Sequence, residues 1–195
     1  MKYRFFIATS TVLLVNTLSY GQSKTYDSVR QVDFLNFTFS LPWCAKEYRL
    51  PTKVTVKKGS FESKKNDTYV SVNKKEILYT DFTGDNIDEA VVPVVCGQVA
   101  ANYAGSEEVL VFTLRNGKPE LLATLNEGIF EHDYKRYYQS AYLSAESKVR
   151  VDHNKLIISK ESDGSHASPE NEVRLEYIWN GHGFVLAGKP VKKRL

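Results

Sequence analysis

Oxygen-bearing side chains alternate along one short stretch of this chain. Asp81, Thr83 and Asp85 stand two residues apart, and Glu89 follows four residues later. Alternate side chains on a tight loop can converge on one point, and calcium binds roughly six to eight oxygen ligands. The spacing therefore makes Asp81, Thr83, Asp85, the backbone carbonyl of Ile87 and Glu89 the candidate ligands of a Ca²⁺ ion.

The same stretch can instead be a tight turn between two strands. An EF-hand needs an acidic residue at the last loop position, where this chain has Val92, and Asn86 replaces its usual glycine. In a turn, Asp81 and Asp85 would accept hydrogen bonds from backbone N–H groups of the loop. We favour this structural interpretation, and calcium binding stays open as the alternative.

Other catalytic patterns are weak. The four histidines are far apart in sequence without the spacing of metal ligands, and the Gly-x-Ser-x-Gly motif of many hydrolases does not occur. We therefore expect a non-enzymatic protein. Two alternatives remain, namely a secreted hydrolase that uses a divalent cation at the 81–89 loop, and an inhibitor or immunity protein of the cell envelope.

The first 21 residues are typical of a secretory signal peptide. Lys2 and Arg4 precede an apolar stretch that is too short to span a bilayer, and small residues at Ser19 and Gly21 precede a plausible cleavage site. We expect a single exported β-rich domain over residues 22–195, secreted or periplasmic and not membrane-spanning. The signal peptide takes away two of the 26 basic residues, which leaves 24 against 23 acidic ones, so nothing indicates a nucleic-acid partner.

The chain contains two cysteines, Cys44 and Cys96. In an exported protein the expected state is a disulfide between them, and the alternative is two buried thiols.

Turn residues punctuate the chain at short intervals, and the segments between them favour strands. Asn116-Gly117 is typical of a type I′ hairpin turn, and two further hairpins are expected across Asp152-His-Asn154 and Asn180-Gly-His-Gly183. Short helices are expected over 27–32 and 130–143, and a polar loop over 163–171. The predicted fold is mainly β, an antiparallel sheet or sandwich of about eight to ten strands with one or two short helices.

Two motifs resemble known families. The stretch from Asp81-Phe-Thr-Gly-Asp85 to Glu89-Ala-Val-Val92 is similar to the calcium-binding loop of FG-GAP/VCBS repeats, although one copy does not make a propeller. Together with Cys96 and the hairpin Tyr177-Ile-Trp-Asn-Gly-His-Gly-Phe184, it also resembles the bacterial LppP/LprE lipoproteins over residues 76–190. That resemblance implies a small secreted bacterial domain without established catalytic activity. This chain lacks the lipidation cysteine, so we expect a form without a lipid anchor.

From these features we expect an interaction module of the cell envelope whose partner is an envelope protein or a glycan. The candidate contact surfaces are Trp43, the tyrosines between Tyr134 and Tyr142, and the 163–171 loop.

Overall fold

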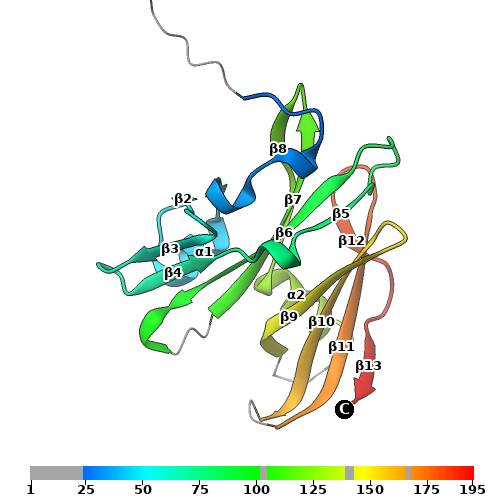
Figure 1. Cartoon of the computed structure of the whole chain (residues 1–195). Helices are drawn as coiled ribbons and strands as arrows, with labels where there is room; N and C mark the ends of the chain where they lie inside the picture. The colour runs from blue at the N-terminus through cyan, green and yellow to red at the C-terminus, as the bar shows by residue number, and fades with distance from the viewer. Residues whose placement is uncertain (1–23, 102–104, 139–142, 166–167) are drawn as a thin grey trace, which may run out of the picture.

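The structure is a computed structural model that describes residues 24–101, 105–138, 143–165 and 168–195. The predicted signal peptide lies outside this part of the chain. Within it, no helix is long and apolar enough to cross a membrane. The fold is mainly β, as predicted, with all strands paired antiparallel in three sheets (Figure 1).

The central sheet has the order β3-β4-β6-β7-β8, and β5 pairs with the first residues of β6. Its strands are β3 (Ser60–Ser63), β4 (Thr68–Ser71), β5 (Leu78–Thr80), β6 (Glu89–Gln98), β7 (Gly105–Arg115) and β8 (Lys118–Asn126).

The C-terminal sheet has the order β12-β11-β10-β9, and β13 pairs with β11. Its strands are β9 (Leu143–Asp152), β10 (Lys155–Ser165), β11 (Ser168–Trp179), β12 (Phe184–Leu186) and β13 (Val191–Arg194). A third, two-stranded sheet joins β1 (Thr38–Ser40) to β2 (Lys53–Thr55).

Strand β6 is buried on both faces, which explains its continuous apolar sequence. Ala90, Val92 and Val94 face an N-terminal layer whose core includes Phe34, Phe39, Leu41 and Val54. Val91, together with Val109 and Val111 of β7, packs against Leu156, Ile158, Val173 and Leu175 of the C-terminal sheet. The central sheet is therefore the middle of three layers.

The helices are short. The α-helices are α1 (Pro42–Tyr48) and α2 (Glu127–Lys135), and the 3₁₀ helices are η1 (Val29–Gln31), η2 (Phe34–Asn36), η3 (Lys74–Glu76) and η4 (Val99–Ala101). Helix α2 starts where Asn126 Oδ1 accepts a hydrogen bond from the N–H of Ile129 at 3.2 Å.

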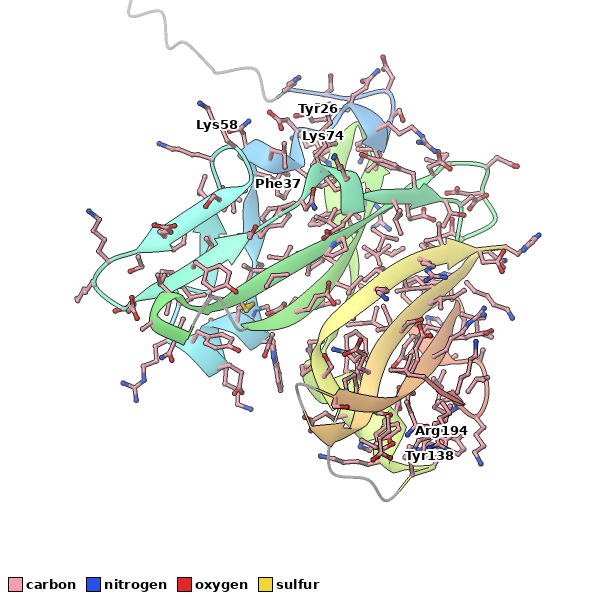
Figure 2. The ribbon with its side chains drawn as sticks, turned by 60° about the horizontal axis from the view of Figure 1, so that its bottom comes forward. Tyr26, Phe37, Lys58, Lys74, Tyr138 and Arg194 are labelled. Atoms are coloured by element: carbon pink, nitrogen blue, oxygen red, sulfur yellow. A yellow bond between two sulfur atoms is a disulfide. The ribbon has the colours of Figure 1, made fainter. Side chains whose placement is uncertain are left out.

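The predicted disulfide is confirmed. Cys44 of α1 is bonded to Cys96 of β6, with the two Cα atoms 5.9 Å apart. Figure 2 shows this bond in yellow beside α1. Closing a loop of this length stabilises the native state by about 4 kcal/mol in the chain-entropy treatment. The bond holds the N-terminal layer against the central sheet.

Several local predictions need correction. The described part contains thirteen strands and not about eight to ten, because short strands such as β3 and β13 were not predicted. The helix expected over 130–143 runs from Glu127 to Lys135, since Asn126 caps it earlier. Residues 163–165 and 168–171 of the loop expected over 163–171 belong to paired strands, since Ser162 of β10 pairs with Asn171 of β11 and Ser165 pairs with Ser168. The polar composition of this segment is typical of a loop and equally of a solvent-exposed hairpin, so composition alone did not distinguish them.

Candidate functional site

The loop from Asp81 to Glu89 is folded around its own carboxylates. Asp81 accepts hydrogen bonds from the N–H groups of Gly84 at 2.7 Å and Asn86 at 2.8 Å, and from the hydroxyl of Thr83 at 3.4 Å. Asp85 accepts from the N–H of Ile87 at 2.8 Å. Gly84 and Asn86 both have positive φ angles, of 79° and 66°, which residues of these two types adopt readily. The loop is therefore a turn whose aspartate side chains are hydrogen-bonded within the loop itself.

Glu89 anchors the end of this loop from inside the protein. Its carboxylate is fully buried and accepts the N–H of Phe82 at 2.7 Å. Burial raises the pKa of Glu89, although hydrogen bonds from Phe82, Thr83 and Thr113 act in the opposite direction. At Asp81 slight desolvation opposes the backbone hydrogen bonds, which prevail and lower the pKa of that carboxyl.

The five candidate calcium ligands thus share one loop, but they point in different directions. Glu89 turns inward to the backbone of Phe82, whereas the Asp81 carboxylate turns to the backbone N–H groups of Gly84 and Asn86. Among the described residues, no group of three or more His, Cys, Asp or Glu side chains is arranged to hold a metal ion. Of the five candidates, Asp81 and Asp85 have carboxylates that could bind a cation if they gave up their hydrogen bonds to backbone N–H groups. Calcium binding therefore stays a prediction.

The acidic loop and the C-terminal aromatic hairpin meet in space. Phe82 packs edge-on against Phe184 of β12, with ring centroids 4.9 Å apart. Phe184 in turn packs against Trp179 of β11, with ring centroids 5.5 Å apart. Two motifs about one hundred residues apart in the chain therefore form one aromatic cluster between the sheets.

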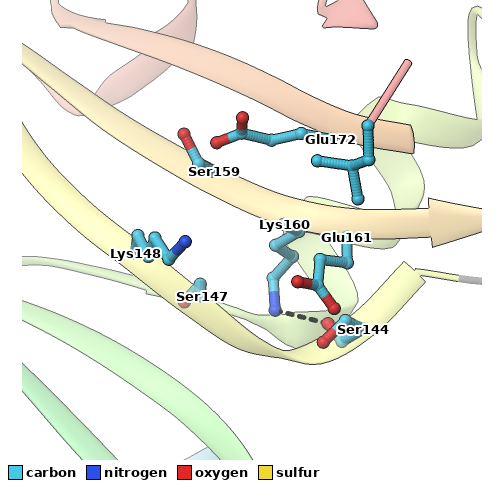
Figure 3. Close-up of a pocket in the computed structure, with 8 residues that line it drawn as sticks. Ser144, Ser147, Lys148, Ser159, Lys160, Glu161 and Glu172 are labelled. Atoms are coloured by element: carbon cyan, nitrogen blue, oxygen red, sulfur yellow. Dashed lines mark hydrogen bonds between the residues drawn. The ribbon is translucent and has the colours of Figure 1, made fainter. Parts of the chain in front are cut away.

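Ionisable side chains buried between the sheets form the most unusual feature of the core. Lys160 of β10 is fully buried, and its Nζ donates to Glu127 Oε2 at 2.9 Å and to the carbonyl of Ser144 at 2.8 Å. Figure 3 shows the Lys160 amine directed at Ser144. Burial raises the pKa of Glu127, and the nearby Lys160 only partly offsets this. This ion pair fixes the start of α2 to the C-terminal sheet.

A second contact ties the other end of α2 to the same sheet. The hydroxyl of Tyr177 donates to Asp133 at 3.0 Å. Burial and the neighbouring carboxylate both raise the pKa of Tyr177. Together with the Lys160–Glu127 pair, this bond attaches both ends of the nine-residue helix to the C-terminal sheet.

Glu107 of β7 is a third buried acid close to Lys160. It is 5% exposed, and its Oε2 has no hydrogen-bond partner in the described part of the chain. Burial raises its pKa to about 8, with Lys160 lowering it and Glu127 and Glu76 raising it. Glu107 borders a cavity of about 200 Å³ together with Glu76, Pro93, Ser147, Lys148 and Val149.

The solvent-facing side of the C-terminal sheet carries a broad groove. Cross-strand pairing places Lys148, Ser159, Arg174 and Val191 in one row across four strands. We call this side the outer face. By the same register it comprises Lys148, Arg150, Asp152, Lys155, Ile157, Ser159, Glu161, Glu172, Arg174, Glu176, Ile178, Val185, Val191 and Lys193.

Charged and apolar side chains alternate on the outer face. A groove of about 480 Å³ runs over Ile157, bordered by Arg150, Arg174 and Lys193. A smaller hollow of about 110 Å³ adjoins it and shares Ser159 and Glu172 with it (Figure 3). Arg174 and Lys155 both pair with Glu176, at 3.0 and 2.9 Å.

Exposed apolar side chains gather at the same place. Eight large hydrophobic residues are exposed in the described part of the chain, and three of them, Ile178, Val185 and Val191, lie on the outer face. Their exposed fractions are 37%, 41% and 58%, and Leu195 borders the adjoining hollow. Ile157 of the same face is only 4% exposed.

The contact surfaces expected from the sequence have mostly internal roles. Trp43 packs over Gly128 at the start of α2, so close that a Cβ there would lie 2.7 Å from the indole ring. Tyr134 is buried, and Tyr138 donates its hydroxyl to the carbonyl of Pro190 at 2.7 Å. Figure 2 shows Tyr138 near the C-terminal strand. Tyr137 is 40% exposed, and Tyr142 lies outside the described residues.

Sequence reasoning missed the buried charges and the outer face. Lys160, Glu107 and Glu127 resemble ordinary surface residues in the sequence, and only the tertiary fold buries them. A partial signal existed in the strictly alternating pattern Val173-Arg-Leu-Glu-Tyr-Ile178, which places Arg174, Glu176 and Ile178 on one side of a strand. Comparison of the chain with models of protein families, with curated proteins and with solved structures found no match.

Proposed function

We propose that this chain is an exported, non-enzymatic interaction module that holds a protein partner of the cell envelope on its outer face. The observation that carries the proposal is a groove where the exposed Val191 lies beside Arg150 and Arg174. The exposed side chains of Ile178 and Val185 lie on the same outer face, outside the groove. Protein interfaces combine exposed apolar side chains and arginine within a polar rim. A scattered set of exposed hydrophobic residues would not call for this explanation.

The charges of the outer face supply a basis for specificity. Cations and anions lie side by side there. Lys193 pairs across the strands with Glu172, and Lys155 and Arg174 both contact Glu176. A partner whose charges are opposite to those of the outer face would associate faster and in one orientation. A partner that places like charges against them would be repelled. Mixed charges favour a protein over a uniformly anionic polymer as the partner.

The disulfide and the family resemblance support export. A disulfide that joins two layers of the fold is stable where thiols are oxidised, as outside the cytoplasm. The resemblance to LppP/LprE lipoproteins is the reason for placing the module at a bacterial envelope, secreted or periplasmic.

The proposal is tested by reversing charges on the outer face. The variant Arg150→Glu/Lys193→Glu changes two exposed cations that have no part in the core, and Lys64→Glu/Lys65→Glu makes the same charge change in the turn between β3 and β4. Each purified protein is immobilised and exposed to a detergent extract of the native envelope, and the captured partner is titrated. We expect about tenfold weaker binding for the outer-face variant alone. Equal binding by both variants would overturn the proposal.

A further inference from the structure

The cavity beside Glu107 lies on the opposite side of the C-terminal sheet from the outer face. Glu107 of β7 and Ser147 of β9 border it from the two facing sheets, and Glu76 of η3 borders it from the side. Two atoms of its border, Glu107 Oε2 and Ser147 Oγ, are buried without a hydrogen-bond partner among the described residues. Buried polar atoms are nearly always paired, so a carboxyl oxygen and a hydroxyl without partners beside a cavity indicate a missing polar partner.

We propose that this cavity binds a primary ammonium group carried on a short alkyl chain, such as an alkylamine or a lysine-like side chain. An ammonium has three N–H donors, and Glu107, Ser147 and Glu76 offer three acceptors around one space. Of the other lining residues, Pro93 and Val149 are apolar and suit the alkyl chain, and Lys148 is cationic. The volume of about 200 Å³ corresponds to roughly six water molecules, which matches a ligand of that size.

The oxygen atoms around the cavity fit an ammonium group better than a divalent metal ion. Calcium takes roughly six to eight oxygen ligands, and the border of the cavity holds three oxygen-bearing side chains. An ammonium needs fewer acceptors and tolerates an apolar wall beside its stem.

Four charged groups surround Glu107 and set how binding responds to pH. Lys160 attracts its carboxylate, Glu127 and Glu76 repel it, and Lys148 borders the cavity. Because Glu107 holds a proton up to about pH 8, an incoming ammonium must displace that proton. Affinity should therefore rise about tenfold per pH unit between pH 6 and 8 and level off above.

The test uses n-butylammonium as the probe, followed by amide chemical shifts of the intact mature protein. We expect saturable shifts around Glu107 and Val149 that n-butanol and tetramethylammonium do not reproduce. Glu107→Gln should weaken binding at least about tenfold and abolish its pH dependence. Glu76→Gln, at an exposed position, should weaken it severalfold. Glu120→Gln on the exposed part of β8 serves as the matched control.

The variant Lys148→Met tests whether the protein's own Lys148 amine occupies the cavity in place of an added amine. If Lys148 competes for the cavity, its removal should strengthen n-butylammonium binding. Three results would overturn the proposal: n-butanol binding as well as n-butylammonium, Ca²⁺ producing the same shifts with higher affinity, or the absence of saturable shifts from the amine in both the wild type and Lys148→Met.

Discussion

Replacing Glu107 by glutamine should remove a large part of the pH dependence of stability. In the native protein burial raises the pKa of Glu107 from 4.5 to about 8. In the unfolded chain the group has its ordinary pKa. Between these two values the native state binds a proton that the unfolded state has lost, so the free energy of unfolding falls as the pH rises. Below pH 4.5 the effect is absent, and above pH 8 it is complete.

The magnitude follows from the size of the pKa change. At about 1.4 kcal/mol per pH unit, moving from 4.5 to about 8 corresponds to a loss on the order of 5 kcal/mol. Domains of this size are stable by roughly 5–15 kcal/mol, so the loss would be large. Glu89, Glu108 and Glu127 also have raised pKa values through burial and act with the same sign. The difference between wild type and Glu107→Gln isolates the contribution of Glu107.

The assay is urea denaturation at a series of pH values from 5 to 9, followed by the fluorescence of the two tryptophans. The wild type should lose stability steadily across this range, whereas Glu107→Gln should lose clearly less. Glu120→Gln changes an exposed acid on β8 and should keep the wild-type slope. Parallel stability curves for the wild type and Glu107→Gln would refute the reasoning, because they would mean that Glu107 ionises normally in the folded protein.

Three further predictions concern other parts of the structure. Lys160→Ala should cost about 3–5 kcal/mol because it leaves Glu127 buried without its partner, whereas Lys160→Met/Glu127→Leu should recover most of that loss in the same urea assay; equal losses in both variants would contradict this. Mass spectrometry of the non-reduced mature protein should show the loss of two hydrogens, and Cys44→Ala/Cys96→Ala should lower stability by about 4 kcal/mol; two alkylatable thiols in the native protein would argue against the bond. Ca²⁺ should raise the Tm of the wild type but not of Asp81→Ala; identical melting with Ca²⁺ and with EDTA would remove the 81–89 loop from consideration as a cation site.

The sequence predicted those features that depend on local patterns. The hairpin turn at Asn116-Gly117 forms with positive φ at both residues, and the Asp152–Asn154 turn likewise joins two strands. The alternation of apolar residues correctly gave a mainly β fold. Helix α1 was missed because seven residues with a proline at the start carry too short a pattern to recognise.

The buried charges could not be predicted because their burial depends on contacts far apart in sequence. Lys160 meets Glu127 across 33 positions, and Glu107 meets Ser147 only because β7 and β9 face each other. The candidate calcium loop could be predicted only in part. Its oxygen spacing was visible in the sequence, but the direction of Glu89 towards the N–H of Phe82 depends on how the loop closes on β6.

Site-specific photocrosslinking tests most directly whether the outer face is the interaction surface. A photoreactive residue is placed at Val185 on β12 and, in a matched variant, at Leu121 on β8 of the central sheet; the two positions are 41% and 39% exposed. Both variants are expressed in the native envelope and irradiated. The proposal predicts one discrete protein adduct from Val185, lost when Arg150→Glu/Lys193→Glu is added, and none of that kind from Leu121. The same adducts from both positions, or an adduct from Leu121 alone, would contradict it.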